Sequence, residues 1–300
     1  MRIGVDVGGT KIEAIALEDD GGEKLRRRVP TPRDYEGSLA AIADLVAAVE
    51  RETGSRGSVG IGMPGTISPA TGLIKNANSV WLNGRPFAED LTERIGRPLR
   101  FSNDANCFAL SEAVDGAGAG GRVVFGVIVG TGTGGGIAVD QRVLTGPNAL
   151  AGEWGHNPLP WPRDDERPGP PCYCGKSGCI ETFLSGPGLM RDHAAVTGHD
   201  ASPAHIVAAA QRGDATAEAT LIRYEDRMAR GLATVINILD PDVIVLGGGL
   251  SNLERLYRNV PRLWQKYGFS DRVDTVLLPP VHGDSSGARG AAWLWGHGKT

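Results

Sequence analysis

The sequence predicts an α/β fold made of two similar halves, with a metal-binding loop in the second half. Residues 2–7 (RIGVDV) are expected to form a buried strand, and a glycine turn at 8–11 leads into a second strand at 12–17. Residues 123–129 (VVFGVIV) and the Gly/Thr turn at 130–136 repeat this arrangement and are followed by a returning strand. The repetition indicates an internal duplication, in which we expect the two turns to face each other across a cleft.

The composition excludes several classes of function. A chain of 300 residues, of which 41% are hydrophobic, can form one large or two medium domains. Its net charge of −4 argues against nucleic acids and anionic membranes as main partners. No apolar run approaches the roughly 18 residues of a transmembrane helix, and no signal-peptide pattern precedes the first strand. Four cysteines, three of them in one short segment, fit a reducing compartment, so we expect a cytoplasmic protein.

Helices and strands alternate along the rest of the chain. Segment 35–53 is predicted to be an amphipathic helix, because Leu39, Ile42, Val46 and Val49 fall on one face. Residues 185–240 are expected to be mostly helical. The other expected strands cover 58–65 (ending in a Pro-Gly turn), 98–103, 242–246 and 273–278, and the other helices cover 86–95, 104–115, 215–239, a segment from about 252, and about 285–296.

The segment 152–181 carries the group most specific for a metal. Cys172, Cys174 and Cys179 follow the spacing Cys-x-Cys-x4-Cys, and His156 lies sixteen residues before the first of them. Three thiolates and one imidazole complete a tetrahedral shell that leaves no position for water, so we expect a structural Zn²⁺. The Pro-rich segment between His156 and Cys172 has little apolar content, so the metal would fix its shape. A reduced loop without metal and a disulfide are the alternatives.

The two glycine turns are candidate phosphate-binding segments. Backbone N–H groups in such turns can surround phosphate oxygens. Asp6 lies at the end of the first strand, where a carboxylate can hold Mg²⁺ directly or through water. Taken alone, the first turn also fits an ordinary glycine hairpin.

Asn103 and Asp104 follow a predicted strand and begin a helix. Residues of these types cap helix N-termini, which would be a purely structural role. A carboxylate at this position is also kept ionised by the helix N-terminus, and it can then accept a proton from a substrate hydroxyl. Cys107, in the same helix, has apolar neighbours and is expected in the core.

Two other segments are weaker candidates for binding. Residues 72–84 (GLIKNANSVWLNG) are rich in Asn and contain a Trp, which suits sugar hydroxyls but also suits a plain surface loop. The triplet Gly247, Gly248 and Gly249 follows the strand at 242–246 and leaves room for a nucleotide base or its ribose.

Together these segments resemble the ROK family of sugar kinases and repressors, over essentially the whole chain. Asn103-Asp104 match the position of the family's catalytic aspartate. Within the family, 75–84, 152–161 and 282–295 look most like bacterial fructokinases of the manno(fructo)kinase type. The family motifs are resembled by 6–11 (DVGGTK), 130–136 (GTGTGGG), 152–156 (GEWGH) and 172–181 (CYCGKSGCIE).

The resemblance implies two actin-like, ribonuclease-H-like α/β domains around a deep cleft. The smaller would take 1–112 with 285–300, and the larger 113–284 with the zinc loop at 156–179. It also implies a transferase of carbohydrate metabolism, which phosphorylates a hexose with ATP and forms a homodimer. We expect fructose to be preferred, then mannose or glucose, then N-acetylglucosamine.

The resemblance also implies residue roles. Asp104 would be the catalytic base that takes the proton of the sugar's 6-hydroxyl, and Asp6 would hold Mg²⁺. Sugar hydroxyls would bind Asn78, Asn103, Asp104, Glu153, His156 and Glu181. ATP would bind Asp6, Gly8, Gly9, Thr10, Lys11, Gly130, Thr131, Gly132, Thr133, Gly134, Gly247, Gly248 and Gly249.

Two functions of other classes compete with a kinase. A sugar-responsive repressor would need a DNA-binding module, usually before the first strand, and here a strand begins at residue 2. A non-catalytic sugar- or nucleotide-binding protein would not need Asp104, Asp6 and both phosphate turns. The sequence therefore favours the enzyme.

Overall fold

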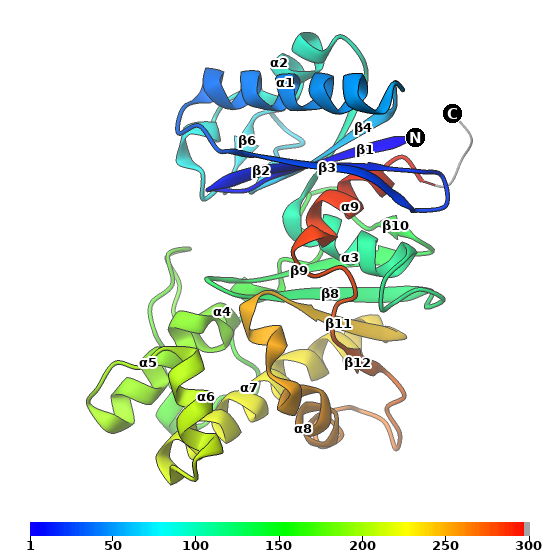
Figure 1. Cartoon of the computed structure of the whole chain (residues 1–300). Helices are drawn as coiled ribbons and strands as arrows, with labels where there is room; N and C mark the ends of the chain where they lie inside the picture. Colours follow the sequence, from blue (N-terminus) through cyan, green and yellow to red (C-terminus); the bar gives the residue numbers. More distant parts are fainter. Residues whose placement is uncertain (297–300) are drawn as a thin grey trace. The chain divides into compact units, whose positions relative to one another are not determined.

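The computed structural model of the chain describes residues 1–296 (Figure 1). These residues form two compact α/β units. Unit 1 comprises 1–122, 136–151 and the chain from 281 on, and unit 2 comprises 123–135 and 152–280. The domain bounds implied by the resemblance stay a prediction, and their last four residues, 297–300, lie outside the described part of the chain.

The first sheet has the strand order β3-β2-β1-β4-β7. Its first three strands are antiparallel neighbours, and β4 and β7 continue the sheet in parallel with β1. These strands are β1 (Arg2–Val7), β2 (Lys11–Leu17), β3 (Glu23–Pro30), β4 (Ser58–Met63) and β7 (Leu99–Asn103).

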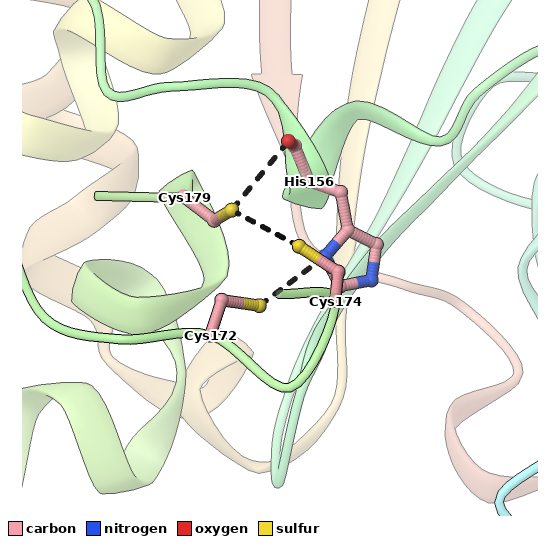
Figure 2. A group of neighbouring side chains, drawn as sticks. All are labelled: His156, Cys172, Cys174 and Cys179. Atoms are coloured by element: carbon pink, nitrogen blue, oxygen red, sulfur yellow. Dashed lines mark hydrogen bonds between the residues drawn. The ribbon is translucent and has the colours of Figure 1, made fainter. Parts of the chain in front are cut away.

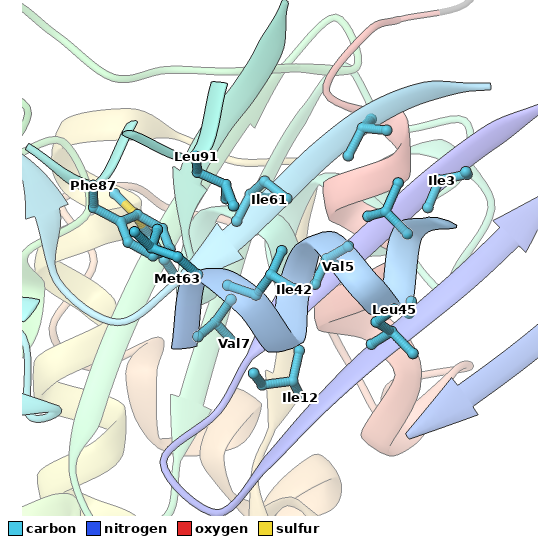
Figure 3. Packing of buried hydrophobic residues seen from close by; sticks show 14 of the residues in the cluster. Ile3, Val5, Val7, Ile12, Ile42, Leu45, Ile61, Met63, Phe87 and Leu91 are labelled. Atoms are coloured by element: carbon cyan, nitrogen blue, oxygen red, sulfur yellow. The ribbon is translucent and has the colours of Figure 1, made fainter. Parts of the chain in front are cut away.

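Helices cover both faces of this sheet (Figure 1). The helices α1 (Tyr35–Thr53) and α2 (Phe87–Ile95) lie on one face, where Ile42 and Leu45 of α1 meet Val5 and Ile12 of the sheet (Figure 3). On the other face lie α3 (Asp104–Val114) and α9 (Ser286–Trp293). A side chain at Gly4 of β1 would meet the Ala288 carbonyl oxygen at 1.9 Å, so only glycine lets α9 lie so close to the sheet.

The strand β3 was not predicted. Its sequence, EKLRRRVP, has three consecutive arginines and no strict alternation of apolar and polar residues. It occupies the edge of the sheet, where charged side chains face water and discourage pairing with another chain. Because of these charges, the segment shows no hydrophobic periodicity from which a strand could be predicted.

The second sheet has the order β10-β9-β8-β11-β12, which corresponds strand for strand to the first and supports the predicted duplication. The strands β11 and β12 run parallel to β8, and β10 pairs with β9 in the antiparallel sense. They are β8 (Val123–Val129), β9 (Thr133–Val139), β10 (Arg142–Val143), β11 (Val243–Gly247) and β12 (Val276–Leu278).

The helices of unit 2 are organised around the long helix α7 (Ala215–Leu239), against which α5, α6 and α8 pack. Its buried face carries apolar side chains such as Leu221, Met228 and Leu232. The expected helix from 252 is preceded by a 3-10 turn, η4 (Gly249–Asn252). The others are α4 (Ile180–Leu184), α5 (Gly186–Thr197), α6 (Pro203–Gln211) and α8 (Glu254–Trp264).

Short elements complete the description: β5 (Thr66–Ile67), β6 (Ile74–Lys75), η1 (Val80–Leu82), η2 (Trp154–His156), η3 (Asp164–Glu166) and η5 (Gly283–Ser285). Within residues 1–296, no helix combines the length and the apolar character needed to cross a membrane.

Candidate active site and metal centre

The four predicted metal ligands meet at one point of unit 2. One ligand atom from each of His156, Cys172, Cys174 and Cys179 lies within 4.8 Å of all the others (Figure 2). The Nδ1 atom of His156 is 3.5 Å from Cys172 Sγ, and the sulfurs of Cys174 and Cys179 are 3.6 Å apart. No two of the cysteines form a disulfide. The 3-10 turn η2 supplies the histidine, and the segment before α4 supplies the cysteines.

These distances fit zinc. With Zn–S bonds of about 2.3 Å and Zn–N bonds of about 2.0 Å, tetrahedral ligands lie roughly 3.8 Å apart for two sulfurs and roughly 3.5 Å for a sulfur and a nitrogen. Burial and the neighbouring thiol of Cys174 raise the pKa of Cys179 to about 12, so a thiolate here needs a cation beside it. The Cys3His group is therefore suited to a closed, structural zinc site.

A second anchor holds the Pro-rich part of the loop. The carboxylate of Glu166, in η3, is buried and accepts hydrogen bonds from the guanidinium groups of Arg227 and Arg230 on α7, at 2.7–2.8 Å. Close by, the ring of Trp161 stacks on Tyr267 with centroids 5.4 Å apart. Burial opposes ionisation of Glu166, yet the bonds from Arg230 and Arg227 lower its pKa to about 2. We call this group of Glu166, Arg227 and Arg230 the loop clamp.

The signature segment that contains Glu153 and His156 packs on the second glycine turn. A side chain at Gly155 would meet the carbonyl oxygen of Thr133 at 1.9 Å, so this position requires glycine. From the first turn of α4, the Oε2 atom of Glu181 accepts the backbone N–H of Thr133 at 3.0 Å. Glu153 is exposed, whereas His156 and Glu181 are half-buried. Unit 2 thus brings three predicted sugar-binding residues to the turn that is predicted to bind phosphate.

The glycine triplet lies beside the same turn. The strands β8 and β11 are parallel neighbours, with Gly247 paired to Ile128, so both glycine segments follow the carboxyl ends of adjacent strands. Such ends are where α/β sheets bind nucleotides. Gly248 has φ +81°, and a side chain there would meet the Val129 carbonyl oxygen at 2.5 Å. The exposed Gly248 and Gly249 thus border the second turn at an open edge.

Thr133 has a buried hydroxyl group that forms no hydrogen bond with the described residues. Its side chain is buried, and its Oγ1 has no hydrogen-bond partner among the described residues. A buried hydroxyl without a partner is costly unless a ligand satisfies it. Gly130, Thr131, Gly132 and Gly134 of the same turn are at least partly exposed.

In unit 1, the Asp104 carboxylate lies close enough to Asp6 to disfavour its ionisation. Desolvation, the Asp104 carboxylate and the Glu13 carboxylate raise the pKa of Asp6 to about 7, and Lys11 opposes this rise. Glu13 faces Asp6 across the β1–β2 pair and is itself buried, with one oxygen bonded to Arg28 and the other without a partner in the described chain. Several carboxylates with few cations nearby suit a divalent metal ion, which would restore the charged form of Asp6.

Asp104 is the first residue of α3. The residue as a whole is exposed to solvent. Protein atoms nevertheless crowd its carboxylate, and this desolvation raises its pKa. Hydrogen bonds from the backbone N–H groups of Ala105 (2.8 Å) and of Asp104 itself oppose the rise. The neighbouring Asn103 caps the helix, because its Oδ1 accepts the N–H of Asn106 at 2.8 Å. Asn103 therefore has the structural role of capping the helix, and the carboxylate of Asp104 remains accessible.

The first glycine turn, at 8–11, follows β1 and begins two residues after Asp6. It is closed by a hydrogen bond from Gly8 N–H to the carbonyl oxygen of Lys11, at 3.0 Å. Gly9 and Thr10 are exposed at its tip. Asn78 is exposed in the loop before η1, in the same unit. Cys107 is fully buried, as predicted.

Sequence reasoning missed Tyr173, which lies between two metal ligands. Its hydroxyl oxygen is 2.9 Å from His156 Nε2, although 83% of the side chain is exposed. Desolvation and the negative charges of Glu181, Cys172 and Glu153 raise the pKa of Tyr173 to about 12, so its hydroxyl is protonated at neutral pH. Its place between the two cysteines was visible in the sequence, but the direction of its side chain was not.

Comparisons with known proteins show the family to which the chain belongs. A family model described as the ROK family matches residues 2–297. The N-acetyl-D-glucosamine kinase of Vibrio parahaemolyticus is 39% identical over 299 residues, covering 98% of this chain and 99% of its own. An Escherichia coli protein of the same name is 40% identical over 304 residues, with the same coverage of each chain.

Solved structures are similar over the same length. The ROK hexokinase of Thermus thermophilus has a TM-score of 0.87 and 32% identity, covering 98% of this chain and 97% of that one. The ROK family glucokinase of Streptomyces griseus, in complex with glucose and AMPPNP, has a TM-score of 0.78 and 29% identity, covering 98% of both chains. The predicted actin-like α/β fold is confirmed, and the chain belongs to the ROK family, as one of its sugar kinases.

Proposed function

We propose that the protein transfers the γ-phosphoryl group of ATP to the 6-hydroxyl of a free hexose, and that this hexose is N-acetyl-D-glucosamine. Relatives of that name share 39–40% of their residues with this chain over almost its full length. The preference for fructose expected from sequence rests on three short segments only. Similarity over the whole chain carries more weight, so N-acetylglucosamine takes first place and fructose becomes the second candidate.

The position and the raised pKa of Asp104 are the main support for phosphoryl transfer. Its carboxylate is accessible at a helix start, and its raised pKa makes it a better proton acceptor than an ordinary aspartate. We infer that it takes the proton of the sugar hydroxyl as the oxygen attacks phosphorus. Phosphoryl transfer otherwise needs positioning and neutralisation of charge.

The remaining residues would position the two substrates. Glu153, Glu181, His156 and Asn103 would bind sugar hydroxyls, with Asn78 as a weaker candidate, because carboxylate and imidazole groups match the donors and acceptors of a sugar. The two glycine turns would bind the phosphates, with the Thr133 hydroxyl as an added donor. Gly247, Gly248 and Gly249 would border the adenosine. Mg²⁺, held by Asp6 directly or through water, would neutralise charge on the phosphates.

The test of this function is a panel of sugars. Zinc-loaded protein with MgATP is offered N-acetylglucosamine, fructose, mannose and glucose, and ADP release gives kcat/KM for each. We expect N-acetylglucosamine to lead by about tenfold or more, since tenfold corresponds to about 1.4 kcal/mol of transition-state binding. A lead for fructose would restore the preference expected from sequence, and no turnover with any of the four would contradict the kinase.

Zinc removal should weaken sugar binding without unfolding the whole loop. Because His156 belongs both to the metal group and to the proposed sugar residues, chelation should raise the sugar KM roughly tenfold, the cost of about one good hydrogen bond. Amide hydrogens of 172–179 should exchange faster, whereas those of 160–167 should stay protected, because the loop clamp needs no metal. An unchanged KM in metal-free protein would separate the metal from the sugar site.

We also propose that the protein is a homodimer of the cytoplasm, following the resemblance and the cysteine usage. Sedimentation of purified protein tests the dimer directly. A monomer at micromolar concentration would contradict it.

A further inference from the structure

Tyr173 connects the metal centre to the proposed sugar residues. It lies between Cys172 and Cys174, and its hydroxyl oxygen lies 2.9 Å from Nε2 of His156. The two rings meet edge to face, with centroids 5.1 Å apart and an interplanar angle of 90°. The phenol therefore covers the outer nitrogen of the metal-binding histidine.

The two ring nitrogens of His156 have different roles in this arrangement. Nδ1 faces the sulfur of Cys172 at 3.5 Å, so Nδ1 is the atom placed for the metal. The ring proton then belongs to Nε2, and Nε2–H donates to the hydroxyl oxygen of Tyr173. A metal-binding histidine commonly gives its second nitrogen such a partner, and here the partner is a hydroxyl group.

A sugar hydroxyl can make the same bond. A phenol and a sugar hydroxyl each offer one donor and can accept at oxygen. In the proposed function, His156 binds a sugar hydroxyl, and Glu153 and Glu181 bind others. With Nδ1 placed for the metal, Nε2 is the nitrogen of His156 that remains for the sugar. The phenol thus stands at the position on His156 that a sugar hydroxyl would occupy.

The phenol is also easy to displace. Of its surface, 83% is exposed to solvent, so few packing contacts hold the ring. Exposed side chains change rotamer within nanoseconds, and a phenol that leaves His156 is hydrated at once. Displacing it costs the hydrogen bond to Nε2 and the edge-to-face contact with the imidazole ring.

We propose that Tyr173 is an internal competitor of the sugar: its hydroxyl occupies the sugar's hydrogen-bonding position on His156 and leaves when a sugar binds. This inference rests on the proposed function. The bond between Tyr173 and His156 lowers the affinity for sugar, and in the empty enzyme it keeps the imidazole oriented. The competition by Tyr173 affects sugar binding and leaves the chemical step unchanged.

The test is Tyr173→Phe, studied as zinc-loaded protein. Losing the competing hydroxyl should lower the KM for sugar about two- to tenfold, the usual worth of one hydrogen bond, with kcat unchanged. Calorimetric titration with the sugar, without ATP, should show the same fall in Kd. Tyr267→Phe is the matched control. It removes a hydroxyl that donates to Asp226, the partner of Arg230, and should leave the KM and the Kd for sugar unchanged.

The outcomes are distinguishable. A KM that rises in Tyr173→Phe would make the hydroxyl a sugar-binding group and overturn the competition. An unchanged KM and Kd, with zinc content equal to that of the wild type, would also overturn it while leaving the kinase intact. If the wild type neither binds nor turns over any sugar of the panel, the proposed function itself has failed.

Discussion

Replacing Asp104 by Asn should lower kcat by about 10²- to 10⁴-fold, the range of lost general-base catalysis. The carboxamide has nearly the shape of the carboxylate, and its oxygen can still accept the Ala105 N–H that the carboxylate accepts at 2.8 Å. It cannot take a proton from the sugar. Sugar and ATP should therefore bind with nearly unchanged KM values while turnover falls, which stopped assays of ADP release would measure.

The pH profile gives a second measure of the same role. Activity requires ionised Asp104, so kcat in the wild type should fall as the pH drops through the pKa of this residue. Because desolvation raises that pKa, the fall should begin at a higher pH than for an ordinary aspartate. In Asp104→Asn the residual activity should lack this limb. Asp44→Asn, an exposed carboxylate of α1, is the matched control, and near-normal turnover in Asp104→Asn would remove Asp104 from the mechanism.

Sequence reasoning was effective where the chemistry is local. The metal ligands share a spacing that only a few geometries satisfy, and the two glycine turns follow apolar strands that cannot be anything but buried. The expected position of Asp104, at a helix start directly after a strand, is also found in the structure, while its catalytic role stays a prediction. Each of these patterns is complete within about 25 residues of chain.

Contacts between segments distant in the chain could not be predicted from the sequence. The loop clamp joins Glu166 to side chains 61 and 64 residues away, and no local pattern selects those partners. One signal was present: Arg227 and Arg230 lie beside Met228 in the buried stripe of α7, and a buried arginine requires an anion. The sequence could therefore have predicted an acidic partner for α7, although not which one.

Replacing Glu166 by Ala should destabilise the protein by about 3–5 kcal/mol, because it leaves two buried guanidinium groups without their common partner. Arg227 and Arg230 are only 5% and 2% exposed. They retain Asp192 and Asp226, so the loss should stay within this range. Chemical denaturation measures the change. Asp164→Ala, in the same 3-10 turn, is the control, because its exposed pair with Arg167 should be worth less than about 1 kcal/mol.

The pH dependence separates the ion pairs from simple packing. Glu166 has a folded-state pKa near 2, below its ordinary value. A carboxylate with a lowered pKa contributes its full stability above the ordinary pKa of about 4.3 and loses it as the pH falls toward the folded value. The difference in unfolding free energy between wild type and Glu166→Ala should therefore be constant from pH 5 to 7 and shrink as the pH falls from about 4 to about 2. A difference that stays constant over this range would mean that Glu166 stabilises the loop by packing alone. In that case zinc would be the main electrostatic anchor of the loop, and its removal should expose 160–167 to exchange as well.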